Sequence, residues 1–348
     1  MTRYIKYLAI GIVASIGAIV FISTQIDFDL FSDAWSQARY LYVVPCVVFL
    51  VVGLLARAQR WRILLNERLP YWRSFSILNV AYLINGFIPF RIGELARIWL
   101  ASRSDPPIAY LTTGGTIIVE RLLDLLAVVL MLAFALAAGP VPEWLRVAGV
   151  TSGITALTGF LILVFLSRRR DISHKILALV TKFVPILREL RLETWLDHFL
   201  DGLLPLAKLR TLLLAFIWTG LSWGFSILAG YILMFTFFEQ ASFAATCLYI
   251  AAAAFAIAVP AVPGNIGTYE GAILLALSAV GYAENINTAT AFAVTVHTVN
   301  VIVHAATGVI GFVQEGVSID QLSQGVRQVT TVTDATEPMT EPNEVRSV

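Results

Sequence analysis

Two acidic residues, Glu94 and Glu270, each follow a Pro/Gly break inside a long apolar stretch of this 348-residue chain. The two breaks are alike, because each runs from a proline through an Ile-Gly pair to the acid, over residues 89–94 and 263–270. An ionisable side chain at membrane depth is costly and therefore suggests a functional site. Broken apolar segments in corresponding places of two halves indicate a binding site between structural repeats. The pattern is typical of a transporter and not of a soluble enzyme, and we expect both carboxylates to face one polar chamber.

The first break carries two arginines beside its acid. Arg91, Glu94 and Arg97 are spaced three residues apart, so in a helix each would neighbour the next. Because a guanidinium matches phosphate oxygens with two parallel hydrogen bonds, this group could clamp a phosphate head group. A self-neutralising structural ion pair is the alternative, and the sequence favours neither. Asn85 precedes the break by about one turn of helix and is expected to line the same cavity.

A second charged group, Glu120, Arg121 and Asp124, lies inside the apolar stretch 111–138. Glu120 and Asp124 share a helical face, and Glu120 lies roughly 14 Å of helix rise from Leu111, near the middle of a bilayer. Charged side chains at that depth are expected to face the protein interior and to take part in substrate binding. We expect Arg121 to neutralise either Glu94 or Glu270.

The second break holds Asn265, Thr268 and Glu270. Thr268 is expected to cap the helix that returns from the break, with Glu270 near the positive N-terminus of that helix. Two interpretations stay open: the acid stabilises the helix end, or the helix end receives a phosphate group.

Three polar residues, His297, Asn300 and His304, share one face of the last apolar stretch, because their spacings are three, four and seven residues. They could relay protons with Glu270, and the alternative is hydrogen bonding between helices. No metal site is expected, because no close set of His, Asp and Cys accompanies them. No cofactor is expected, because nucleotide-binding and hydrolase motifs are absent from the sequence.

The composition indicates a membrane protein. The chain is 58% hydrophobic and 14% charged, with a mean hydropathy of +0.80, whereas soluble domains are roughly half apolar and a quarter charged. All apolar blocks are expected to be helical, because backbone polar groups in lipid must be paired within the segment. The blocks cover residues 4–22, 41–56, 74–87, 111–138, 147–166, 212–238, 243–259, 271–280 and 289–312.

Basic residues predict the orientation. Arg3 and Lys6 put the N-terminus in the cytoplasm, and the five arginines within residues 57–73 mark a cytoplasmic loop. Segments 74–103 and 243–281 are then re-entrant hairpins from opposite sides, which leaves the C-terminus in the cytoplasm; a fully spanning 243–262 would put it outside. A net charge of +1, with no Lys or Arg between Arg210 and Arg327, argues against nucleic acid as a partner.

These elements predict an all-α, polytopic membrane bundle, built as an inverted repeat with two re-entrant, broken-helix hairpins. The first repeat covers residues 41–138 and the second 212–312, within a transmembrane domain of residues 1–315. Residues 168–210 are expected to form an amphipathic cytoplasmic linker whose helices rest in the membrane interface. Residues 316–348 are expected to form a disordered polar tail.

In combination, three motifs resemble the lysylphosphatidylglycerol synthase transmembrane-region family, a flippase-like membrane domain: Pro89-x-Arg91-x-Gly93-Glu94-x-x-Arg97, Glu120-Arg121-x-x-Asp124 and Pro263-Gly264-x-x-Gly267-x-x-Glu270. The resemblance covers residues 5–315. It implies an integral inner-membrane domain associated with moving aminoacylated or other lipids between leaflets. Members that make lysyl lipid carry a further C-terminal transferase domain; this chain shows none, so no aminoacyl transfer is expected.

Three functions are compatible with these patterns. The first is a flippase or scramblase-like transporter of lipids with anionic head groups, in the inner (plasma) membrane. The second is a membrane-embedded enzyme that modifies a lipid head group by acid–base chemistry. The third is a scaffold that does not transport and instead holds a lipid synthase or glycosyltransferase. We expect the first, without enzymatic activity.

Overall fold

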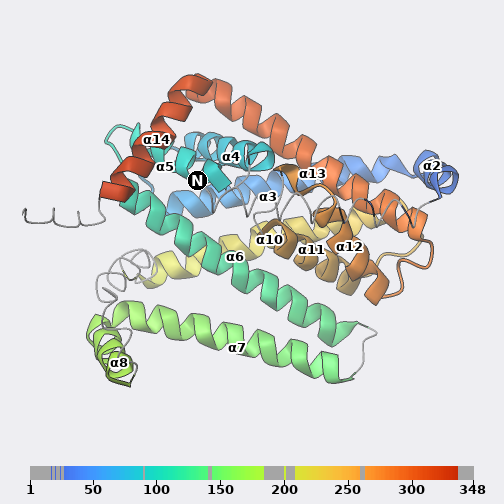
Figure 1. The fold of residues 1–348 in the computed structure, drawn as a ribbon, viewed down its shortest axis with the longest axis horizontal. Coiled ribbons are helices and arrows are strands. Elements are labelled where there is room, and N and C mark those ends of the chain that lie inside the picture. The colour runs from blue at the N-terminus through green and yellow to red at the C-terminus, as the bar shows by residue number, and fades with distance from the viewer. Residues whose placement is uncertain are drawn as a thin grey trace, which may run out of the picture.

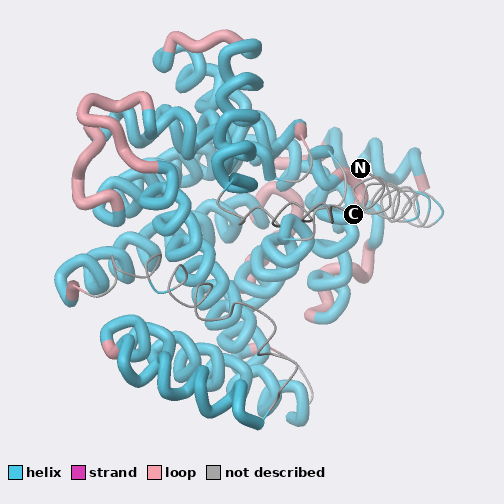
Figure 2. Tube along the Cα trace, turned by 60° about the vertical axis from the view of Figure 1, so that its left-hand side comes forward, coloured by secondary structure: helices cyan, strands magenta, loops and turns pink. Residues whose placement is uncertain are grey.

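The computed structural model describes residues 17, 20, 24, 27–88, 91–139, 143–183, 200, 208–258 and 263–335. Within these ranges the chain forms helices and connecting turns and no strand, so the predicted all-α class is confirmed (Figure 2). The predicted apolar block 4–22 and the linker segment 184–207 lie outside the described residues, apart from single positions.

The first repeat consists of a long helix, a hairpin of two short helices and a second long helix. Helix α3 (Val43–Leu64) follows the 3-10 turn η1 (Tyr40–Tyr42), α4 (Tyr71–Phe87) and α5 (Ile92–Ser102) form the hairpin, and α6 (Tyr110–Ala138) follows it. Helix α4 ends before Pro89, because a proline disfavours helical geometry in the residue before it, and Ile88 is extended with ψ 127°.

The second repeat has the same order of elements. Helix α10 (Leu209–Met234) is followed by α11 (Phe243–Ala258), the 3-10 turn η5 (Pro263–Asn265), α12 (Thr268–Ala279) and the long α13 (Ile286–Glu315). The four hairpin helices have 17, 11, 16 and 12 residues. Each is shorter than the roughly 20 residues that cross a bilayer, which suits hairpins that enter and return.

Helices that occupy the same position in the two repeats make equivalent contacts. Helix α3 packs on its counterpart α10, α4 packs on α13 as α11 packs on α6, and α5 contacts α6 as α12 contacts α13. Helices α3 and α10 run antiparallel, because the ring centroids of Tyr42 and Phe235 are 5.6 Å apart and those of Phe49 and Phe225 are 6.2 Å apart. Equivalent helices that run in opposite directions define an inverted repeat.

The two hairpins lie toward opposite ends of the bundle (Figure 1). The α4–α5 hairpin is close to the end that carries α14 (Ile319–Ala335), and α14 packs on α5. The α11–α12 hairpin lies toward the end that carries α2 (Phe28–Ser36), and α2 packs on α13. This arrangement agrees with hairpins that enter from opposite sides.

Glycines bring α13 unusually close to α4. A β-carbon at Gly308 would overlap Leu83 and the carbonyl oxygen of Asn79, and one at Gly311 would overlap the backbone of Ser76. Small residues allow this close approach of helix backbones in membrane proteins, where packing replaces the hydrophobic effect as the force between helices. The contact fixes the first hairpin against the last long helix.

Three helices in the described part of the chain are long and apolar enough to cross a membrane: α3 together with η1, α10 and α13. Their outer faces expose large apolar side chains, for example Val48 on α3, Ile217 on α10 and Ile310 on α13. Such faces would be unfavourable in water and suit contact with lipid chains. The helices therefore indicate a membrane protein.

Two more helices, α7 (Glu143–Arg168) and α8 (Arg170–Phe183), follow α6, and α8 lies at the same end of the bundle as α14 (Figure 1). The prediction of a disordered tail from residue 316 is wrong for residues 319–335, which form α14. The reason is an apolar face that the polar composition hides: Leu322 and Val329 are buried, and Gly325 fits against the ring of Trp99. Residues 336–348 lie outside the described residues.

Candidate functional site

The tips of the two hairpins touch each other. At the start of α5, Arg91 donates a hydrogen bond of 3.2 Å from Nη2 to the carbonyl oxygen of Ile257 near the end of α11. Both tips use left-handed backbone, with φ 54° at Arg91 and 52° at Asn265. This conformation is strained for most residues other than glycine and is tolerated best by asparagine, so the surrounding contacts must hold it, above all at Arg91.

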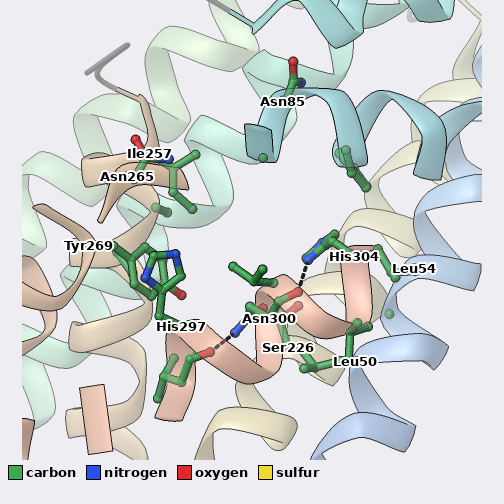
Figure 3. Close-up of a pocket in the computed structure, with 18 of the residues that line it drawn as sticks. Leu50, Leu54, Asn85, Ser226, Ile257, Asn265, Tyr269, His297, Asn300 and His304 are labelled. Atoms are coloured by element: carbon green, nitrogen blue, oxygen red, sulfur yellow. Dashed lines mark hydrogen bonds between the residues drawn. The ribbon is translucent and has the colours of Figure 1, made fainter. Parts of the chain in front are cut away.

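A cavity of about 330 Å³ lies at these tips, between α3, α4, α10, α11 and α13. Figure 3 shows side chains of α13 on one side of the cavity and the tip residues Ile257 and Asn265 on the other. The predicted site residues that line it are Asn85, Arg91, Arg121, Asn265, His297, Asn300 and His304. The remaining predicted residues lie outside its lining: Glu94, Arg97, Glu120, Asp124, Thr268 and Glu270. The expectation that both carboxylates face one chamber is not confirmed, because neither is among the lining residues; each is held by residues that do line the cavity, Glu94 by Arg91 and Arg121 and Glu270 by His297.

Glu94 is held by arginines that face the cavity. Its Oε1 lies 2.7 Å from Nη2 of Arg121 and 3.9 Å from Nη1 of Arg91. The open question of which acid Arg121 neutralises is thus answered in favour of Glu94. The side chains of Arg91 and Arg121 are 34% and 40% exposed, so both remain accessible to a ligand.

A charge network that is largely buried lies behind this pair, and its most exposed side chain is that of Asp124, at 16%. Arg97 was expected to pair with Glu94, but it is 2% exposed and lies 2.5 Å from Glu120 of α6. Arg60 of α3 lies 3.6 Å from Glu120 and 2.7 Å from Asp124. The predicted role of Arg97 in a phosphate clamp is wrong, because a buried arginine needs a buried carboxylate more than an exposed neighbour on its own helix.

Aromatic rings complete the network. The guanidinium of Arg97 lies 3.8 Å from the ring centroid of Trp61. The indole nitrogen of Trp223 on α10 donates to Asp124 at 3.0 Å, and Arg57 lies 5.1 Å from the centre of the same ring. These residues tie α3, α5, α6 and α10 together and place Arg57 on the cavity wall.

Sequence reasoning missed Arg57, Arg60 and Trp223 as site residues. Arg57 and Arg60 were expected in a cytoplasmic loop after residue 56, whereas α3 continues to Leu64 and Arg60 is 1% exposed. The available signal was the uninterrupted run from Ala56 to Leu64, which contains no glycine or proline that would end a helix.

The second acid, Glu270, has a different set of partners. Its Oε1 lies 2.5 Å from Nδ1 of His297, and its Oε2 accepts a hydrogen bond of 2.7 Å from the backbone N–H of Gly267. Thr268 was expected to cap α12, but α12 begins at Thr268 and its hydroxyl donates to the carbonyl oxygen of Asn265. Glu270 itself therefore stabilises the start of the helix, and the ring of Tyr269 lies 4.6 Å from that of His297 on the cavity wall.

The polar face of α13 uses its own backbone. The side-chain nitrogen of Asn300 donates to the carbonyl oxygen of Val296 at 2.8 Å, and Nδ1 of His304 donates to that of Asn300 at 2.7 Å (Figure 3). Nε2 of a neutral His304 is then left as an acceptor. Asn85 borders the cavity, but its oxygen accepts the N–H of Gly93 and so closes the first tip.

Metal binding has no visible basis in the described part of the chain, where no three His, Cys, Asp or Glu residues gather in a way that could hold an ion. The site instead offers guanidiniums, histidines and amides around a mostly apolar space. The arginines make such a site suitable for an anion, because a guanidinium supplies both charge and hydrogen bonds.

The family model that describes the lysylphosphatidylglycerol synthase transmembrane region matches residues 8–308. No curated protein and no solved structure matches the chain. The match contains both hairpins, the long helices α3, α6 and α10, most of α13 and every residue of the charge network. A membrane protein related to lipid metabolism is therefore indicated by both the helices and the match. Since the match covers most of its length, the chain belongs to the lysylphosphatidylglycerol synthase transmembrane-region family.

Proposed function

We propose that this protein moves a lipid with an anionic head group between the two leaflets of a membrane. The observation that carries the proposal is the contact between two hairpins from opposite ends of the bundle, at a cavity lined by Arg57, Arg91 and Arg121. Broken helices that meet inside a bundle are typical of transporters, in which the substrate site lies between inverted repeats.

The mouth of the cavity suits a lipid whose chains stay outside. Phe87, Ile88 and Ile257 belong to the cavity lining, and they are 60%, 43% and 44% exposed. Apolar side chains at this edge can contact acyl chains, while the arginines attract the phosphate of the head group inside. The head group would thereby cross the apolar layer without entering lipid.

The other charged residues would support this site. The buried network of Arg60, Arg97, Glu120 and Asp124 fixes α5 and α6, which carry Arg91 and Arg121, in relation to α3. The pair of Glu270 and His297 joins the start of α12 to α13 beside the cavity. We assign it to opening or closing of the second tip.

The proposed location is the inner (plasma) membrane with both termini in the cytoplasm. The arrangement that supports this orientation is the position of α8 and α14 at one end of the bundle (Figure 1). Arg168, Arg169 and Arg170 lie where α7 ends and α8 begins, and clustered arginines favour the cytoplasmic side.

The test is a leaflet-transfer assay with the purified full chain in vesicles that contain a labelled anionic phospholipid. We expect Arg91→Gln and Arg121→Gln each to slow transfer about tenfold or more, because a hydrogen bond to a charged group contributes roughly 1.5–3 kcal/mol. Arg68→Gln is the matched control, since Arg68 is an exposed arginine outside the cavity. Vesicles that show no protein-dependent transfer, or equal rates for all variants including Glu94→Gln with Glu270→Gln, would contradict the proposal.

A lipid-modifying enzyme is the second candidate, and the short contact between Glu270 and His297 beside the cavity supports it, because an acid–histidine pair is a common base in catalysis. A new lipid species on expression, lost in His297→Gln, would favour it. A scaffold for a lipid synthase or glycosyltransferase would instead show co-purification of that enzyme with the Arg91→Gln variant as well.

A further inference from the structure

The charged side chains around the cavity do not balance. Five arginines and three carboxylates form the connected group, which leaves an excess of two positive charges. The members are Arg57, Arg60, Arg91, Arg97, Arg121, Glu94, Glu120 and Asp124. A net charge in a low-dielectric region is costly unless a counter-ion compensates it.

The excess lies at the cavity wall. Arg60 and Arg97 are fully engaged with buried carboxylates, and Arg121 holds Glu94 at 2.7 Å. Arg91 has only the longer 3.9 Å contact with the same Glu94. Arg57 has no carboxylate partner among the described residues; it lies over the ring of Trp223.

The same wall is a poor site for a cation, although Nε2 of His304 could accept one hydrogen bond from an ammonium group. Its described lining contains arginines and histidines and no aspartate or glutamate. Aromatic faces could attract an ammonium group, but three of the rings that line the cavity already face a side chain: Trp223 faces Arg57, Tyr269 faces His297 and Tyr82 faces His304. A primary amine placed there would lose its water and lie beside the guanidiniums of Arg57 and Arg91, the second of which has only a 3.9 Å contact with Glu94.

We propose that the cavity selects lipids whose phosphodiester head group carries a net negative charge, and that it rejects aminoacylated head groups, which carry an ammonium. The proposal rests on the proposed function, since both use the same cavity, and it narrows the substrate to anionic, amine-free lipids. Phosphatidylglycerol has this chemistry and its lysyl ester does not. The phosphate compensates the charges of Arg57 and Arg91, and Asn265 and Asn300 can donate or accept hydrogen bonds from uncharged hydroxyl groups.

The experiment measures equilibrium binding of short-chain phosphatidylglycerol, its lysyl ester, phosphatidylethanolamine and inorganic phosphate to the purified full chain in detergent. We expect phosphatidylglycerol to bind at least about tenfold more tightly than the lysyl ester, because the arginines repel the added ammonium groups. Arg57→Gln should weaken phosphatidylglycerol binding by about tenfold and reduce this preference. Arg57→Lys, which keeps the charge, should retain the preference, and Arg68→Gln should match the unaltered protein.

Equal or tighter binding of the lysyl ester, or unchanged binding in a folded Arg57→Gln variant, would overturn the proposal. Displacement of phosphatidylglycerol by inorganic phosphate at similar concentrations would overturn a lipid as the ligand and leave free phosphate in its place. Leaflet transfer without preference for anionic lipids would refute this inference alone. Selective binding without any transfer would refute the proposed function and leave the inference standing.

Discussion

Helices α5 and α12 return from the two hairpin tips, and each carries a glutamate as its third residue. Glu94 reaches Arg121 on the long helix that follows, and Glu270 reaches His297 on the corresponding helix of the second repeat. Arg121 and His297 are each the twelfth residue of their helices. The two halves thus share one geometry, in which an acid at the tip is held by the next long helix.

The chemistry of the two halves differs at these matched positions. Arg121 meets its acid with a charged guanidinium that has several N–H donors, whereas His297 meets its acid with a single ring nitrogen. Three residues further along, Asp124 belongs to a buried charge network, while its counterpart Asn300 bonds to the carbonyl oxygen of Val296 in its own helix. The arginines of the cavity lining therefore all belong to the first repeat, and its histidines to the second.

The largest difference in unfolding free energy between the two halves is expected when alanine replaces Asp124 in α6 and its counterpart Asn300 in α13. Asp124→Ala leaves the buried Arg60 without its closest partner, and such a loss costs about 3–5 kcal/mol of unfolding free energy. Asn300→Ala removes one hydrogen bond within a helix and should cost about 1 kcal/mol. Unfolding of both variants in mixed detergent micelles gives the comparison.

A double variant controls for packing. Asp124→Ala with Arg60→Met removes both charges and should recover part of the stability that Asp124→Ala loses, because the uncompensated guanidinium is gone. If the alanine variants at positions 124 and 300 lost equal unfolding free energy, or if the double variant recovered none, the charge network would not distinguish the two halves.

An intermediate effect is expected at glycines of the two returning helices. A β-carbon at Gly93 would overlap the carbonyl oxygen of Ala81 and lie 2.7 Å from Oδ1 of Asn85, whereas one at Gly271 has no atom within 4 Å. Gly93→Ala should therefore destabilise the protein by about 1–3 kcal/mol. Gly271→Ala should stabilise it by up to about 1 kcal/mol, because alanine favours the helix.

Thermal unfolding, followed with a fluorescent dye that does not react with thiols, would measure the stability of both glycine variants. Leaflet transfer should fall only in Gly93→Ala. A neutral Gly93→Ala variant would show that the first tip tolerates a wider gap between α4 and α5. The contact between Arg91 and Ile257 would then not depend on this packing.

Much of the fold follows from the sequence, because apolar length and Pro/Gly breaks are local signals. The breaks before Glu94 and Glu270 mark the ends of α4 and α11, and the short blocks mark the hairpins. Helix α14 escaped prediction because its apolar residues are few and are buried only by contact with α5. A polar average over residues 316–348 cannot show such a face.

The sequence predicted only part of the site. Spacing placed Arg97 beside Glu94, yet Arg97 pairs with Glu120, because a long-range partner in the interior outweighs a neighbour on the same helix. Arg57 and Arg60 look like a basic loop in sequence, and only the continuation of α3 turns them inward. Which acid meets which base depends on how helices pack, and no residue spacing within one segment contains that information.

The smallest effects are expected at the left-handed residues of the two tips, where the halves can be compared most finely. Asn265 has φ 52° and Arg91 has φ 54°. Asn265→Gly should change the unfolding free energy by less than about 1 kcal/mol, because glycine adopts this geometry freely. Asn265→Val should cost about 1–2 kcal/mol, because a branched side chain disfavours it. Arg91→Gly should likewise change the unfolding free energy little, but it should lose leaflet transfer, because it removes a guanidinium from the cavity. If Asn265→Val proved as stable as Asn265→Gly, the second tip would not need left-handed backbone, and the two tips would not be equivalent.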